Sequence, residues 1–224
     1  YFSQLFIQLY HDSGTQNSES VLHAETVHKE RLRVQKLQQE MLLLNEQLMV
    51  QSQHDALTGL PNRAYLNNYA EETLSKALKN QVNFGIEILD IDFFKSVNDT
   101  YGHMEGDHYL TAVADLLSRI TEEYSNVFAA RYGGDEFVLV YYDKSVDEIK
   151  EIMNQLKLST VSVKLPAISQ LGEDHVTLSQ GCCNRIPEPL NRLWDYLARA
   201  DTVLYDVKKK GKNNYKVSER FKKA

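Results

Sequence analysis

The 224-residue sequence contains few cysteines and prolines and no long apolar run. Its two cysteines, Cys182 and Cys183, are adjacent, so they cannot join distant segments, and no Cys/His cluster has zinc-site spacing. The short apolar runs exclude a transmembrane helix. Neither a P-loop nor a G-x-G-x-x-G motif is present, so these two nucleotide-binding loops are not supported. A disulfide scaffold is therefore excluded, and a reducing compartment is the default.

Acidic residues outnumber basic ones by 31 to 25, which gives a net charge of −6. A negatively charged chain is not attracted to nucleic acid or to an anionic membrane, so we expect neither as a partner and no direct membrane insertion. The sequence starts at Tyr1-Phe2-Ser3 and lacks a signal-peptide layout. We therefore expect a cytoplasmic piece of a longer protein, whose parent is free to carry a membrane anchor elsewhere.

Residues 23–53 contain no glycine or proline and are rich in helix formers. A 3-4-3-4 spacing of apolar residues predicts a coiled-coil seam, formed by Val34, Leu37, Met41, Leu44 and Leu48. The seam fits a parallel homodimer stalk, or a helix that packs on its own domain or on missing sequence. Polar seam positions such as Glu30 and Gln51 leave room for alternative registers.

From His54 onward, helical and strand patterns alternate. Helices are predicted over 61–78, 102–122, 146–158 and 189–209, the last with Gly211 as its C-cap. Strands are predicted over 82–92, 127–132, 137–142 and 175–183, the middle two joined by a hairpin at 133–136. This order predicts an α+β fold of ferredoxin-like palm type, in which helices pack on a central, mostly antiparallel sheet.

Two acidic segments are candidates for chemistry. Asp90-Ile91-Asp92 ends an apolar strand, and Asp135-Glu136 follows Gly133-Gly134 at a hairpin tip. Carboxylates at a strand end and on a neighbouring hairpin can converge, and oxygen ligands favour Mg²⁺ or Mn²⁺. From these residues alone, the acids also fit solvated loops, and the glycines also fit an ordinary hairpin turn.

Three separated motifs resemble the GGDEF-domain family, the diguanylate cyclases. They are Asp55–Arg63 (DALTGLPNR), Asp90–Lys95 (DIDFFK) with Asn98-Asp99, Gly102-His103 and Gly106-Asp107 behind it, and Arg131–Phe137 (RYGGDEF). The resemblance runs from about 54 to 217. It implies a palm-like fold of nucleotidyl-cyclase type that condenses two GTP into cyclic di-GMP, with release of two pyrophosphate.

The resemblance also implies roles for the acidic residues. Asp90, the Ile91 carbonyl and Asp135 correspond to the ligands of two Mg²⁺ ions in each half-site, with Mn²⁺ as a possible replacement. Asp135 is the family's candidate general base, and Glu136 corresponds to a secondary ligand; with Lys95 they form the expected catalytic set. Asp92 is expected only to orient the loop.

The resemblance further assigns residues to GTP. Asn98 and Asp107 match the guanine-reading pair, although by its position Asp107 also suits a helix N-terminus. His103 and Leu110 are expected to line the same pocket, and a core role for Leu110 is equally open. The expected phosphate contacts are Lys95, Lys208, Lys212 and the backbone amides of Phe93 and Phe94, while Gly133 and Gly134 permit close approach of the substrate.

Several positions allow more than one interpretation or depart from the family pattern. Arg131 is expected to stabilise the hairpin or to contact substrate, product or a partner. Lys212 stands where the family more often has arginine, and the run 208–212 also fits a solvated helix end. The product-inhibition motif R-x-x-D is replaced by Tyr124–Val127, so we expect no high-affinity inhibition there. Gln180 replaces a usual apolar residue, which fits either a local repacking or a ligand-facing role, and the cysteine pair is expected to serve packing.

The expected organisation has three parts: 1–22 as the end of a missing upstream element or linker, 23–53 as a coiled-coil signalling helix, and 54–224 as the GGDEF domain. One domain holds one GTP, so the symmetric product requires two domains to face each other. We therefore expect a homodimer through the stalk, regulated by a covalently attached upstream sensor. The alternative is a non-catalytic module that binds GTP or cyclic di-GMP.

Overall fold

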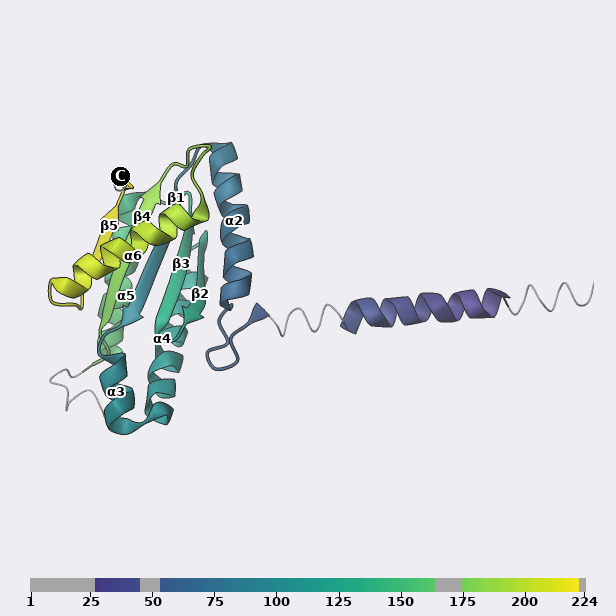
Figure 1. The fold of residues 1–224 in the computed structure, drawn as a ribbon, viewed down its shortest axis with the longest axis horizontal. Coiled ribbons are helices and arrows are strands. Elements are labelled where there is room, and N and C mark those ends of the chain that lie inside the picture. Colours follow the sequence, from purple (N-terminus) through teal and green to yellow (C-terminus); the bar gives the residue numbers. More distant parts are fainter. Residues whose placement is uncertain (1–26, 45–52, 164–174, 222–224) are drawn as a thin grey trace, which may run out of the picture. The chain divides into compact units, whose positions relative to one another are not determined.

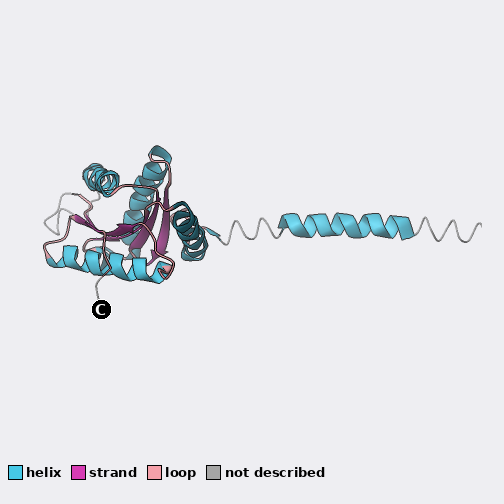
Figure 2. Ribbon diagram, turned by 90° about the horizontal axis from the view of Figure 1, so that it is seen from above, coloured by secondary structure: helices cyan, strands magenta, loops and turns pink. Residues whose placement is uncertain are grey.

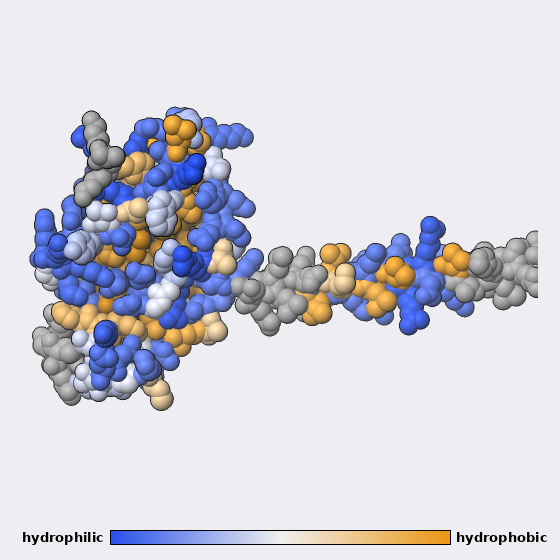
Figure 3. All heavy atoms as spheres, viewed as in Figure 1, coloured by the Kyte–Doolittle hydropathy of each residue, from blue (hydrophilic) through white to orange (hydrophobic). Residues whose placement is uncertain are grey.

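The computed structural model describes residues 27–44, 53–163 and 175–221, and the chain divides into the units Tyr1–Ser52 and Gln53–Ala224. In the first unit a helix covers residues 27–44, within the range predicted to be helical; Leu48 and Gln51 lie outside the described residues. Its seam side chains are 47 to 61% exposed, and apolar groups are visible along its surface in Figure 3; these residues are Val34, Leu37, Met41 and Leu44. No helix in the described ranges combines the length and apolarity needed to cross a membrane.

The second unit is built on a five-stranded sheet in the order β2-β3-β1-β4-β5 (Figure 1). The strands are β1 (Phe84–Ile91), β2 (Val127–Gly133), β3 (Glu136–Tyr142), β4 (Leu178–Arg185) and β5 (Tyr215–Ser218). β1 pairs antiparallel with β3 and β4, β2 pairs antiparallel with β3, and only the β4–β5 pair is parallel. The predicted mostly antiparallel palm is confirmed.

Helices cover both faces of this sheet (Figure 2). They are α2 (Arg63–Asn80), α3 (Phe94–Tyr101), α4 (His103–Glu123), α5 (Val146–Ser159) and α6 (Leu193–Lys209), with a short 3₁₀ turn at Thr160–Ser162. α2 and α6 share one core with the sheet, and α4 and α5 share the other. β1 is buried along its whole length because its alternate side chains enter the two cores, for example Ile88 and Leu89.

The contact between β4 and α6 depends on a glycine. A Cβ at Gly181 would lie 2.2 Å from the Leu204 amide nitrogen and 2.6 Å from the Ala200 carbonyl oxygen. No side chain fits there, so α6 lies directly against the strand. This close packing sets how near the middle of α6 lies to β4.

Two elements, α3 and β5, are not predicted by the sequence, and the C-cap of α6 differs from the predicted one. The apolar residues Phe94, Val97 and Tyr101 of α3 do follow a helical spacing, but the helix has only eight residues and begins without a side-chain cap, so its signal is short. β5 has four residues, too few for an alternating pattern. α6 begins at Leu193 rather than 189 and is capped by Lys210; Gly211, predicted as the cap, follows with φ of 115°.

Candidate active site

The C-terminal end of β1 meets the β2–β3 hairpin. Asp90 pairs with Glu136 across the two strands, and the Ile91 amide donates to the Asp135 carbonyl at 3.4 Å. The turn is possible because Gly133 and Gly134 take φ of 155° and 58°. The two acidic segments that the sequence predicts to converge therefore lie at one end of the sheet.

A lysine from α6 enters this acidic group. Lys208 Nζ lies 2.7 Å from Asp90 Oδ2, and the Asp90 side chain is only 11% exposed. Burial raises the pKa of Asp90 to about 6; the Lys208 hydrogen bond opposes this rise, and the charge of Asp135 adds to it. Burial, together with Asp135, also raises the pKa of Glu136. The site therefore concentrates negative charge that one lysine partly offsets.

Asp92 has a structural role, as predicted for loop orientation. Its carboxylate accepts hydrogen bonds from Thr177 Oγ1 at 3.0 Å, Ser179 Oγ at 2.7 Å and the Asn213 amide at 2.9 Å. Lys212 Nζ lies farther away, at 3.9 Å. Asp92 thus ties the end of β1 to β4 and to the segment that follows α6.

Asn98 on α3 and Gly106 on α4 lie against each other. Asn98 Oδ1 is buried and has no hydrogen-bond partner among the described residues, and a Cβ at Gly106 would lie 2.0 Å from it. Asp107 and His103 are exposed near the start of α4, so they are accessible to a ligand. Leu110 is 3% exposed within the α4–α5 core, which supports its core role.

The predicted phosphate contacts come from two helix ends. Phe93 precedes α3 with φ of 60°, and Lys95 is exposed in the first turn of that helix. Lys212 Nζ lies 4.5 Å from the centroid of the Phe93 ring, which links the segment after α6 to the start of α3. Phe94, by contrast, is partly buried against the α4–α5 core.

Arg131 connects two of the sequence motifs. Its guanidinium donates to Asp55 Oδ1 at 2.9 Å and to the Gly134 carbonyl at 2.8 and 3.2 Å. Burial opposes ionisation of Asp55, but hydrogen bonds from Thr58 and Arg131 outweigh it and lower the Asp55 pKa. Arg131 thus stabilises the hairpin, one of its expected roles; a contact with substrate stays a prediction. Asp55 lies in the motif DALTGLPNR, but the sequence alone does not show that Asp55 pairs with Arg131.

The donor set suits a hard divalent cation. Within the described ranges, no three His, Cys, Asp or Glu side chains group into a metal site by themselves. The predicted set needs only two such side chains, Asp90 and Asp135, together with the Ile91 carbonyl. Magnesium normally takes its other ligands from water and substrate phosphates, so the residues present fit it.

Lys212 aside, the positions that depart from the family pattern lie away from this site or in the core. Gln180 is fully buried and donates to the Met153 carbonyl on α5 at 3.1 Å, so it is a packing residue and does not face a ligand. Cys182 and Cys183 are both fully buried, as expected for packing, and burial raises their pKa values. Tyr124, at the first position of the absent inhibition motif, donates instead to the Gln155 side chain.

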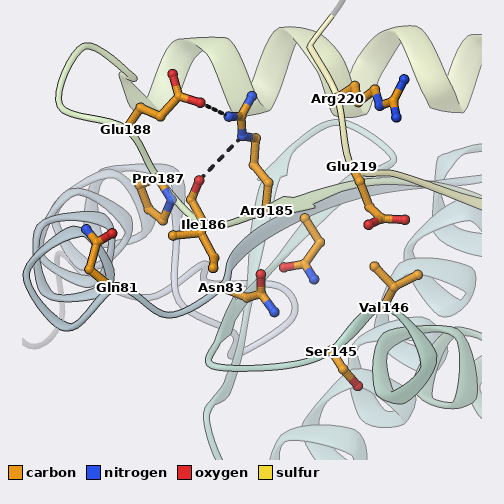
Figure 4. A pocket seen from close by; sticks show the side chains of 11 residues that line it. Gln81, Asn83, Ser145, Val146, Arg185, Ile186, Pro187, Glu188, Glu219 and Arg220 are labelled. Atoms are coloured by element: carbon orange, nitrogen blue, oxygen red, sulfur yellow. Dashed lines mark hydrogen bonds and ion pairs between the residues drawn. The ribbon is translucent and has the colours of Figure 1, made fainter.

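The opposite end of the sheet carries a pocket of about 670 Å³ beside the N-terminus of α5 (Figure 4). Arg185 and Glu188 in its wall form an ion pair with each other, and none of the predicted site residues lines it. The pocket is therefore separate from the candidate active site.

The chain is similar to known proteins in sequence and in fold. Residues 52–214 match the family described as "Diguanylate cyclase, GGDEF domain". Diguanylate cyclase DgcZ of Escherichia coli is 33% identical over 167 residues, which cover 74% of this chain and 53% of the relative. The chain thus spans about half the length of that relative.

Solved structures show the same similarity. The coiled coil and GGDEF domain of DgcB from Caulobacter crescentus, solved in complex with c-di-GMP, matches with a TM-score of 0.69 and 28% identity, covering 89% of this chain and 98% of that one. The isolated GGDEF domain of the same protein matches with a TM-score of 0.66 and 28% identity, covering 75% and 94% of the two chains.

Proposed function

The chain belongs to the GGDEF family of diguanylate cyclases, and from this premise we propose that it condenses two GTP into cyclic di-GMP and two pyrophosphate. One observation carries the proposal: Asp90, Asp135 and Glu136 meet at the end of β1, and Lys208 from α6 reaches the same place. A buried aspartate with two half-buried carboxylates and a lysine beside it suits phosphoryl transfer, in which charge develops on oxygens that metal ions and cations stabilise.

Asp90, Asp135 and the Ile91 carbonyl would hold two Mg²⁺ ions, with Mn²⁺ as a possible replacement. When bound, these ions polarise the α-phosphate and lower the pKa of the attacking ribose 3′-hydroxyl. Asp135 is the candidate acceptor for the hydroxyl proton, and Glu136 beside it is a secondary ligand. The hydrogen bonds of Asp92 already hold the end of β1 in place, which supports the use of Asp90 and Asp135 for catalysis instead of for the fold.

The nucleotide would lie between the starts of α3 and α4. Asn98 Oδ1, which is buried and has no partner in the part of the chain that the structure describes, and the exposed Asp107 carboxylate are acceptors suited to the N–H groups of guanine, which adenine does not present in the same pattern. Lys95, Lys208, Lys212 and the amides of Phe93 and Phe94 are the proposed phosphate contacts. His103 is proposed to border the base.

Catalysis would need two copies of the domain, each aiming its 3′-hydroxyl at the other's α-phosphate. The exposed apolar seam on helix 27–44 supports a homodimer stalk. We propose that residues 23–53 act as the signalling helix, that 54–224 form the catalytic domain, and that an upstream sensor sets the register of the stalk. The proposed location is the cytoplasm.

A chromatographic assay with GTP and Mg²⁺ at several protein concentrations tests the activity, with ATP as the control substrate. We expect cyclic di-GMP from GTP only, at a rate that rises faster than linearly with protein concentration. Tight GTP binding without product would favour the alternative, a non-catalytic binding module.

A matched pair of substitutions tests the site itself. Asp135→Asn should reduce turnover by at least about a hundredfold, since it removes a ligand and the candidate base. Asp143→Asn makes the same change at an exposed position just beyond the other end of β3, where φ of 53° also suits asparagine, and should leave turnover unchanged. Equal activity of the Asp135 variant and the wild type would refute the assigned role.

A further inference from the structure

Asp90 and Asp92 stand two residues apart but are held in different ways. The Asp92 carboxylate accepts three hydrogen bonds that connect it to β4 and to the segment after α6. Among the described residues, the side-chain partner of the Asp90 carboxylate is Lys208, whose Nζ lies 2.7 Å away. Asp90 can therefore exchange its partner without loss of the contacts that hold the strand end.

Lys208 is placed so that it can leave. It lies in the last turn of α6, and its side chain is 30% exposed. Its flexible four-carbon stem carries a single point charge, which forms no bidentate pair with a carboxylate. It faces an excess of negative charge, because Asp135 and Glu136 lie beside Asp90.

We propose that Lys208 is a resident counter-ion of Asp90, that a divalent cation displaces it, and that the released amine then binds the phosphates of the incoming nucleotide. This inference rests on the proposed function and adds to it a coupling between metal binding and nucleotide binding. Without nucleotide, Lys208 competes with the metal for Asp90. With nucleotide, the phosphates hold Lys208 elsewhere, so metal and nucleotide each strengthen the binding of the other.

The first test measures Mn²⁺ affinity without nucleotide, by electron paramagnetic resonance of the free ion. Lys208→Met should bind Mn²⁺ about tenfold more tightly than the wild type, the scale of one charge-assisted hydrogen bond. Lys209→Met is the matched control, because Lys209 is exposed and contacts the Tyr205 ring instead of a carboxylate. Equal or weaker binding by Lys208→Met would overturn the proposal.

The second test detects displacement directly, because removal of any nearby lysine could tighten cation binding. The rate of Lys208 acylation, followed by mass spectrometry, should rise severalfold as Mn²⁺ saturates the wild-type chain. It should fall again when a non-hydrolysable GTP analogue is added, whereas the rate at Lys209 should stay constant. An unchanged rate at Lys208 under saturating Mn²⁺ would overturn the displacement.

These readouts separate the inference from the proposed function. Both Mn²⁺ measurements without nucleotide are independent of turnover, so a chain that binds Mn²⁺ but makes no cyclic di-GMP could still show displacement. Conversely, active turnover with a constant Lys208 reactivity would leave the proposed function intact and remove only the counter-ion role. Absence of any Mn²⁺ binding would overturn both the displacement and the metal assignment.

Discussion

The Tyr141 hydroxyl donates a hydrogen bond to Glu87 Oε2 at 2.5 Å inside the α4–α5 core, where both residues are fully buried. Glu87 Oε1 and Gln180 Oε1 have no hydrogen-bond partner within the described ranges. Gln180 pairs with Leu89, and Cys182 lies directly opposite Glu87, so these side chains share one face of the sheet. A protonated Glu87 keeps this core free of an isolated charge.

This arrangement predicts that stability depends on pH. Burial raises the pKa of Glu87 from 4.5 to about 7, and the Tyr141 hydrogen bond only partly opposes this. The folded state therefore holds the proton more tightly than the unfolded state, so stability is fully present below about pH 4.5 and falls as pH rises to about 7. A shift of this size corresponds to roughly 3 kcal/mol.

Denaturant titrations of Glu87→Gln from pH 5 to 8 check this prediction. Glutamine keeps an acceptor for Tyr141 and carries no charge, so the variant should lie within about 1 kcal/mol of the wild type at pH 5 and exceed its stability by a few kcal/mol at pH 8. Glu71→Gln, at an exposed position on α2, should follow the wild-type profile. Parallel profiles for all three proteins would contradict a neutral Glu87.

The Asp55–Arg131 pair predicts a coupling between the start of the domain and the hairpin. Its side chains are 25% and 15% exposed, so solvent screens it less than a surface pair. In a double-mutant cycle with Asp55→Asn and Arg131→Gln, we expect a coupling of about 1 kcal/mol in the free energy of unfolding. Additive effects of the two changes would show that the pair contributes nothing by itself.

How much of this molecule the sequence could predict depends on the kind of signal. The hairpin and the acidic end of β1 were predictable, because strand ends and glycine turns are local patterns. The Asp90–Lys208 and Asp55–Arg131 pairs were not, because each joins residues more than 70 positions apart. β5 was missed because its pairing with β4 depends on tertiary contact, not on its four-residue pattern.

Gly106 predicts a steric test of the guanine site. A Cβ there would lie 2.0 Å from Asn98 Oδ1, so Gly106→Ala must push the Asn98 amide from its position. If Asn98 reads guanine, GTP affinity measured by calorimetry should fall about tenfold, the scale of one lost hydrogen bond. His108→Ala, at an exposed position two residues further along α4, should bind GTP normally. Unchanged affinity in Gly106→Ala would separate Asn98 from nucleotide binding.

Neighbouring leucines on helix 27–44 allow the coiled-coil prediction to be tested with one residue type. Leu44 lies on the 3-4-3-4 seam and Leu43 does not, yet their exposures in the single chain are 55% and 58%. Leu44→Gln should weaken dimerisation by at least about a hundredfold, since a buried seam leucine contributes roughly 1.5 to 3 kcal/mol and the dimer loses two of them, whereas Leu43→Gln should change it little. Sedimentation equilibrium measures this difference. Because turnover requires two domains, Leu44→Gln should also shift activity to higher protein concentration; equal effects of the two substitutions would contradict the predicted seam.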